Sequence, residues 1–178
     1  MDIIEKIISN FKNNKSLYIG EKVTIAEHML QSAMMAEKSK SKNNLICSSL
    51  LHDYGHFILD NPEELVEKNK DGRHEDIGYE YLKKFFKREV VEPIKHHVLA
   101  KRYLARNKKY YNQLSEASMV SLKLQGGLLN VKDAKSFEKE EFFKDSIRLR
   151  KFDESAKKVG AKIKDIIDYK YLLKASLK

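Results

Sequence analysis

The chain has 178 residues, an apolar content of 42% and a formal net charge of +9, which comes from 35 basic and 26 acidic side chains. This length and apolar content predict one domain with a full hydrophobic core, covering residues 1–178 with its central part at about 15–160 and helical extensions at both ends. No apolar run approaches the roughly 20 residues that cross a bilayer, so membrane-spanning functions are excluded. Cys47 is the only cysteine, so the chain can form no internal disulfide.

The basic residues are spread along the chain and interleaved with acidic ones. This pattern favours an ordinary solvated surface, with attraction of a small anionic substrate as the second interpretation and nucleic acid a distant third. We therefore expect a small-molecule partner, no nucleic acid, no membrane, and a monomer. The lone cysteine and the lack of a basic leader at the N-terminus predict a cytoplasmic protein.

Apolar residues recur at helical spacing in nearly every segment, and no stretch shows the period-two pattern of a strand. In chain order, helices are predicted at 2–13, 24–40, 45–51, 74–86, 87–105, 115–125, 139–157 and 163–177. Thr24-Ile-Ala-Glu27 is a capping box for the second of these, and Asn61-Pro62 marks a further helix start. Pro93 must kink its helix or lie in the first turn. The predicted fold class is all-α, a single helical bundle.

The pattern that points to chemistry is centred on His52 and Asp53, an adjacent pair at the end of an apolar helix. An imidazole nitrogen and a carboxylate are both metal donors, and a carboxylate has two oxygens with which to bridge two ions. A lone histidine on an apolar helix face is usually a core residue, but further donors in the order H…HD…H…H…D reverse that interpretation for the set. The further donors are His28, His74, His97 and Asp153.

The number of donors indicates how many ions the site holds. His28, His52, Asp53 and Asp153 suffice for one ion. His74 and His97 can hold a second ion if Asp53 bridges the two. The set therefore predicts a dinuclear metal site in the centre of the bundle, with open positions for a substrate and an oxygen species. Iron, manganese and zinc all suit such donors, and donor type alone does not choose between them.

Several polar side chains near these donors are candidates for holding a tetrahedral oxyanion. An ordinary solvated basic face explains Lys101 equally well, but it explains Arg150 less well because the neighbours of Arg150 are apolar. His96 is expected to point away from the site, and Tyr110 is expected to pack without a chemical role. The candidates are His56, Lys101, Ser118, Gln125 and Arg150.

At these residues the sequence resembles the HD-domain oxygenases that cleave organophosphonates, of the PhnZ type that acts on 2-amino-1-hydroxyethylphosphonate. The similarity runs over about 18–157. The His-Asp pair alone is shared with phosphohydrolases. The stretch that follows His97 and the Gln-Gly-Gly sequence are much more specific to the oxygenases. The matching motifs are Tyr18-Ile-Gly-Glu21, Glu27-His28, Leu50-Leu-His-Asp-Tyr-Gly-His56, His74-Glu, His97-Val-Leu-Ala-Lys-Arg-Tyr-Leu104, Leu114-Ser-Glu-Ala-Ser118, Gln125-Gly-Gly127, Phe143-Lys-Asp and Arg150-Lys-Phe-Asp153.

The resemblance implies an HD-domain bundle that holds two iron ions as a mixed-valent Fe(II)/Fe(III) pair and uses O2 as co-substrate. It implies that His28, His52 and Asp153 hold one iron, that His74 and His97 hold the other, and that Asp53 is shared. The implied reaction is oxidative cleavage of the C–P bond of 2-amino-1-hydroxyethylphosphonate, which yields glycine and phosphate.

The resemblance also implies roles around the metals. Asp53, His56 and Lys101 would be catalytic. Tyr18 and Glu21 would lie on a loop that closes over the site, with Glu21 facing the substrate ammonium. The residues implied to bind substrate are Tyr18, Glu21, His56, Lys101, Ser118, Gln125 and Arg150.

Other functions remain open on the sequence alone. A hydroxymethylphosphonate oxygenase, which releases formate and phosphate, would use the same residues. An HD-type metal-dependent phosphohydrolase would share the metal site but need no dioxygen. A basic helical binding module would keep a vestigial metal site for structure, and the complete set of donors argues against it.

Overall fold

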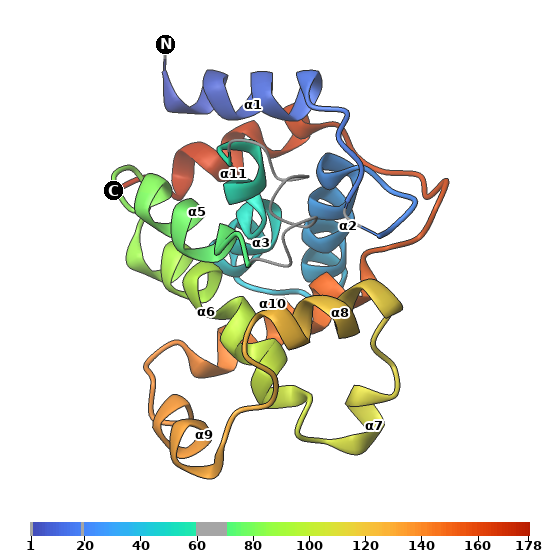
Figure 1. Ribbon diagram of the computed structural model, residues 1–178. Coiled ribbons are helices and arrows are strands. Elements are labelled where there is room, and N and C mark those ends of the chain that lie inside the picture. The colour runs from blue at the N-terminus through green and yellow to red at the C-terminus, as the bar shows by residue number, and fades with distance from the viewer. Residues whose placement is uncertain (1, 19, 60–70) are drawn as a thin grey trace.

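The computed structural model describes residues 2–18, 20–59 and 71–178, and every named element in these ranges is a helix (Figure 1). The prediction of an all-α bundle is confirmed, while the predicted helix start at Asn61-Pro62 lies outside the described residues. The elements are α1 Ile3–Asn13, α2 Ile25–Lys38, α3 Asn43–Leu51, η1 Tyr54–Phe57, α5 His74–Leu82, α6 Arg88–Leu104, α7 Lys108–Tyr111, α8 Glu116–Leu124, α9 Val131–Phe137, α10 Phe143–Ser155, η2 Ile166–Tyr169 and α11 Lys170–Ala175.

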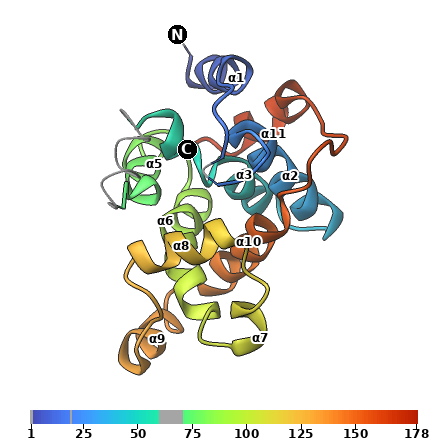
Figure 2. The same cartoon turned by 45° about the vertical axis from the view of Figure 1, so that its right-hand side comes forward.

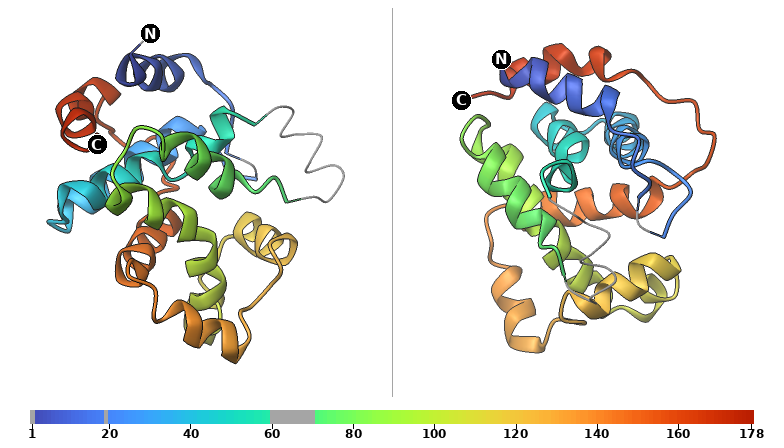
Figure 3. Two further views of the ribbon diagram at one scale, coloured as in Figure 1. Left: turned by 90° about the vertical axis from the view of Figure 1, so that its left-hand side faces the viewer. Right: turned by 45° about the horizontal axis from the view of Figure 1, so that its top comes forward.

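The main hydrophobic core lies between α1, α2, α3, α5, α6 and α11. The terminal helices α1 and α11 pack together at one end of the molecule and cover α2 and α3 (Figures 1 and 3). Helix α3 is enclosed on all sides, since every residue from Leu45 to Leu51 is buried. The residues that follow α3 are therefore held in the centre of the bundle.

Helices α7, α8 and α9 form the opposite end of the molecule, beside α6 and α10 (Figures 1 and 2). Two smaller apolar clusters lie there, one around Ala100 and Phe137 and the other around Ala105 and Leu122. Helix α6 contributes to the main core and to the first cluster, and Ala105, which caps its C-terminus, belongs to the second, so α6 connects the two ends. The middle of α6 carries His97 and Lys101, which places both in the zone between the ends.

Several helix ends differ from their predicted positions. Helix α5 ends at Leu82 rather than at about 86, and the helix predicted at 139–157 begins only at Phe143. The polar segment before it contains α9, which is seven residues long and capped by the Asn130 side chain. The segment predicted as one helix at 163–177 is split into η2 and α11, with Asp165 capping the first. Helices as short as these carry too few turns to show an apolar period.

Pro93 lies in the second turn of α6, and the helix continues through it to Leu104. Proline lacks the N–H that would bond the carbonyl of Glu89 one turn earlier. The Ser48 hydroxyl, which reaches across from α3, lies 3.5 Å from that carbonyl and donates to the carbonyl of Val90 at 2.8 Å. The hydroxyl therefore contacts α6 beside the proline without replacing the missing bond. Of the two predicted alternatives, a kink or a position in the first turn, the second is wrong.

Candidate metal centre

Five elements bring the predicted metal donors together in the centre of the bundle. The capping box forms as predicted, with Thr24 accepting from the Glu27 amide at 3.1 Å, and it sets the start of α2 so that His28 faces inward. The other donors come from the end of α3, the first turn of α5, the middle of α6 and the last turns of α10. The six donors are His28, His52, Asp53, His74, His97 and Asp153, of which His74 is partly exposed and the rest are buried.

The donors form two groups that share one carboxylate. In the first group, His28 Nε2 lies 3.1 Å from His52 Nε2 and 3.4 Å from Asp53 Oδ2. In the second group, His74 Nε2 lies 3.0 Å from His97 Nε2, and these nitrogens lie 3.2 and 3.4 Å from Asp53 Oδ1. The two oxygens of Asp53 thus face different groups, as a carboxylate that bridges two ions would.

Asp153 completes the first group from α10. Its Oδ1 lies 3.3 Å from His28 Nε2 and 3.8 Å from His52 Nε2. That oxygen has no hydrogen-bond partner among the described residues, and the same is true of both oxygens of Asp53. Buried carboxylate oxygens without donors are costly, and a cation between them removes the cost.

The histidine rings are oriented by backbone carbonyls. The Nδ1 atoms of His28, His52 and His97 lie 2.9, 2.9 and 2.7 Å from the carbonyls of Ala156, Ser49 and Ile94, respectively. A carbonyl only accepts, so each Nδ1 carries the proton and each Nε2 presents a lone pair. Facing lone pairs at about 3 Å repel unless a cation or a proton lies between them, which fits metal coordination through Nε2.

Charge in the first group also favours a cation. Burial alone would raise the pKa of Asp53, but His52 and His28 hold it well below the usual carboxylate range. Arg150 and His28 do the same for the pKa of Asp153 against the effect of burial. Burial acts to lower the pKa of His28, whereas the nearby carboxylates of Asp153 and Asp53 raise it to about 9. The carboxylates thus draw a proton onto His28, and a metal ion would take the place of that proton.

Gly55 brings the two groups close enough to share Asp53. A Cβ atom on Gly55 would lie 1.9 Å from the carbonyl oxygen of His74 and 3.0 Å from the amide nitrogen of Gly78. Gly55 does not have a positive φ, so the requirement for glycine here comes from the close contact between η1 and α5 and not from the backbone conformation. This contact sets His74 beside Asp53.

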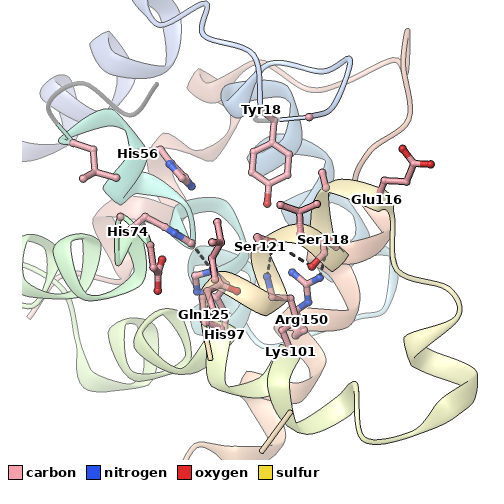
Figure 4. Close-up of a pocket in the computed structure, with 18 residues that line it drawn as sticks. Tyr18, His56, His74, His97, Lys101, Glu116, Ser118, Ser121, Gln125 and Arg150 are labelled. Atoms are coloured by element: carbon pink, nitrogen blue, oxygen red, sulfur yellow. Dashed lines mark hydrogen bonds between the residues drawn. The ribbon is translucent and has the colours of Figure 1, made fainter. Parts of the chain in front are cut away.

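A cavity of about 340 Å³ opens beside the second group of donors (Figure 4). His74 and His97 form part of its wall, and Tyr18 lies across from them (Figure 4). Six of the seven predicted substrate-binding residues line the cavity. These six are Tyr18, His56, Lys101, Ser118, Gln125 and Arg150.

Glu21 is the exception, since it does not line the cavity. Its Oε1 accepts a hydrogen bond from Ser115 Oγ at 2.7 Å and lies 3.2 Å from the ammonium of Lys157. Lys157 was not singled out from the sequence, although it lies only four residues after Asp153 and just beyond the end of α10. Ser121, which accepts a hydrogen bond from Lys101 at 2.9 Å and lines the cavity, was also missed. Its position three residues after Ser118 was the available signal.

The wall opposite the histidines is cationic, and its charges differ in how they are paired. Arg150 forms ion pairs with Asp153 and Glu154 and donates to the Tyr110 hydroxyl at 2.9 Å, so Tyr110 does more than pack. Burial, with Arg150 nearby, lowers the pKa of Lys101 from 10.5 to about 7. The wall therefore combines one fixed cation with one amine whose charge depends on pH.

Two aromatic contacts define the rest of the site. Tyr18 stacks on His28 with ring centroids 4.3 Å apart and planes 12° apart. His56 stacks on His74 with centroids 4.2 Å apart. Burial and the adjacent His74 lower the pKa of His56 to about 3, so this imidazole is neutral. His96 packs on Phe137 instead of facing the site, as expected.

The helical bundle with two His/Asp groups that share one aspartate is the arrangement of an HD domain. The family model described as HD domain matches residues 25–170, and the chain belongs to this family. Among the described residues, no helix is both long and apolar enough to cross a membrane.

Three proteins of known sequence are similar to the chain over most of its length. It is 42% identical, over 83% of its length and 76% of the relative, to the [1-hydroxy-2-(trimethylamino)ethyl]phosphonate dioxygenase (glycine-betaine-forming) of Leisingera caerulea. It is 40% identical, over 93% of its length and 85% of the relative, to the hydroxymethylphosphonate dioxygenase of Gimesia maris. An uncharacterised protein of Acanthamoeba polyphaga mimivirus is 34% identical over 96% of the chain and 83% of that protein.

Proposed function

We propose that this protein is an iron- and O2-dependent oxygenase that cleaves the C–P bond of a small 1-hydroxyphosphonate. The observation that carries the proposal is the cavity in which two metal-binding histidines face a lysine and an arginine. Such a cavity suits a dianionic tetrahedral group next to a metal centre. The two relatives named as phosphonate dioxygenases support the same reaction class.

His28, His52 and Asp153 would hold one iron ion, His74 and His97 the other, and Asp53 both. When bound, such ions supply positive charge for oxyanions and redox chemistry with dioxygen. In the overall reaction, C1 is oxidised from an alcohol to a carboxylate, the C–P bond breaks, and dioxygen is reduced with both its atoms entering the carboxylate and phosphate products.

The side chains of the cavity have separate tasks in this reaction. The cations Lys101 and Arg150, with Ser118 and Gln125, would bind the phosphonate oxygens and orient the C–P bond toward the metal centre. His56, which is neutral, would accept a hydrogen bond from the C1 hydroxyl. Tyr18 would cover the site and exclude water.

The test is release of phosphate from a panel of phosphonates after iron is loaded without air. We expect release from small 1-hydroxyphosphonates when dioxygen is admitted, and none while it is absent. Phosphate release from a phosphate ester without dioxygen would instead identify a phosphohydrolase. Zinc-loaded protein is the matched control, because it fills the same donors without redox chemistry.

The member of this class predicted from the sequence is 2-amino-1-hydroxyethylphosphonate, with Glu21 facing its ammonium. Glu21 is already bonded to Lys157 and Ser115. That assignment therefore requires the substrate ammonium to replace Lys157 at Glu21. Hydroxymethylphosphonate has no amine, so its binding does not require Lys157 to leave Glu21.

Lys101 predicts how activity depends on pH. Its pKa of about 7 means that the cavity loses a cation as the pH rises above neutrality. Because only the ammonium can pair with phosphonate, kcat/KM should fall about tenfold for each pH unit above this pKa. The profile is measured between mildly acidic and mildly alkaline pH.

The control is Lys101→Arg, which keeps its charge throughout that range. Its profile should lose the alkaline decline, even if its absolute rate is lower. An alkaline decline of the same size and midpoint in both proteins would assign the titration to another group.

A further inference from the structure

The ammonium of Lys157 lies in a cage of anionic and hydroxyl groups next to the substrate cavity. It lies 3.2 Å from Glu21 Oε1 and 3.3 Å from Glu154 Oε1. It also donates hydrogen bonds to the hydroxyls of Ser115 and Ser118 at 2.9 and 2.8 Å. Carboxylates and hydroxyls arranged in this way form a receptor for an organic ammonium group.

An aromatic ring completes the cage. The Lys157 ammonium lies 5.9 Å from the centroid of the Tyr18 ring, within the distance for a cation–π interaction. Tyr18 and Ser118 both line the cavity as well, so they form the wall between cavity and cage. A cationic group on a substrate in the cavity would thus meet this wall with Lys157 directly behind it.

The cage has no room for a second cation. The side chains of Lys157 and Glu21 are only 11% and 15% exposed. Glu21 pairs with Lys157, and Glu154 pairs with both Lys157 and Arg150. An added ammonium would have to lie beside the Lys157 ammonium in this partly buried place, and like charges brought together there are strongly disfavoured.

We propose that Lys157 is a specificity-determining residue that fills the ammonium position itself. The enzyme therefore acts on 1-hydroxyphosphonates without a cationic substituent, of which hydroxymethylphosphonate is the simplest. This inference rests on the proposed function, since it names the substrate of the same cavity. Lys157 selects by excluding positive charge, which is discrimination against the competing substrate.

The first experiment compares kcat/KM for hydroxymethylphosphonate and 2-amino-1-hydroxyethylphosphonate. The wild type should prefer hydroxymethylphosphonate by about tenfold or more, the scale of one charge-assisted hydrogen bond. Lys157→Met, which keeps an unbranched side chain one atom shorter and removes the charge, should shift this ratio toward the amino compound by a similar factor. Adding Glu21→Gln to Lys157→Met should abolish the gain.

The matched control is Lys158→Met, since Lys158 is the exposed neighbour, and it should leave the ratio unchanged. If Lys157→Met does not fold, Lys157→Gln takes its place because it keeps a hydrogen-bond donor. A wild type that prefers the amino compound, or a ratio that does not move in the Lys157 variant, would overturn the inference.

A second experiment needs no turnover. Lys157→Ala leaves the cage empty, so methylammonium chloride should raise its Tm by several degrees more than sodium chloride at the same ionic strength. The wild type should show no such difference. No phosphate release from any phosphonate, together with a methylammonium effect in Lys157→Ala, would refute the proposed function and support the cage. Release of phosphate without any methylammonium effect would do the reverse.

Discussion

Replacing Asp53 with alanine should remove both metal ions from the protein. Its two oxygens face the two histidine groups separately, and no other described carboxylate lies between them. Metal content, measured by elemental analysis after purification with iron, should fall from two ions per chain to almost none. Asp53→Asn keeps the shape of the side chain and removes its charge, and its metal content should fall nearly as far.

His97→Ala is the comparison that identifies the bridge. It removes one donor of the second group and leaves the first group complete, so about one ion per chain should remain. Far-ultraviolet circular dichroism would verify that each variant is folded. If Asp53→Ala and His97→Ala lose equal amounts of metal, Asp53 does not join the two groups.

Arg150→Ala should destabilise the fold by about 3–5 kcal/mol, the usual cost of removing one partner from a buried ion pair. The Arg150 side chain is only 3% exposed and is paired with Asp153 and Glu154. Without the guanidinium, both carboxylates lose their cation, and Asp153 also loses its orientation toward His28. The free energy of unfolding in urea at neutral pH measures this effect.

The pH dependence of this loss has a definite sign. The folded-state pKa of Asp153 is depressed by Arg150, so the stabilisation is fully present above the ordinary carboxylate pKa and is lost as the pH falls through the folded value. The difference between Arg150→Ala and wild type should therefore shrink in acid. Arg148→Ala, which breaks one hydrogen bond to Ser41, should cost about 1 kcal/mol or less. Wild-type stability of Arg150→Ala, with only substrate affinity reduced, would show that the pairing is not structural.

The candidate metal donors, which the structure brings together, could be selected from the sequence because their signal is chemical and lies in their types and order. His52 and Asp53 are recognisable without knowing how the helices pack, and the other donors follow as inward-facing residues of predicted helices. The cavity could be predicted only in part. Lys157 meets Glu21 because two segments far apart in the sequence approach each other beside Ser115, the N-cap of α8, and no local pattern records such an approach.

The fold shows the same division between local and tertiary information. Long amphipathic helices such as α1 and α2 have enough turns to reveal their buried faces. Pro93 indicates a missing backbone hydrogen bond from the sequence alone. Helix α6 nevertheless continues through Pro93 to Leu104, packed against α3, α5 and α10, and this packing is tertiary information that no local pattern records.

The contact at Gly55 makes one small residue a spacer between the two halves of the metal centre. The segment after the His-Asp pair touches the first residue of α5 so closely that even a methyl group would collide with the His74 carbonyl. Any larger residue at this position in this chain would therefore have to push η1 away from the start of α5. Because His74 lies at that start and faces Asp53, the same movement would widen the gap between Asp53 and the second group of donors.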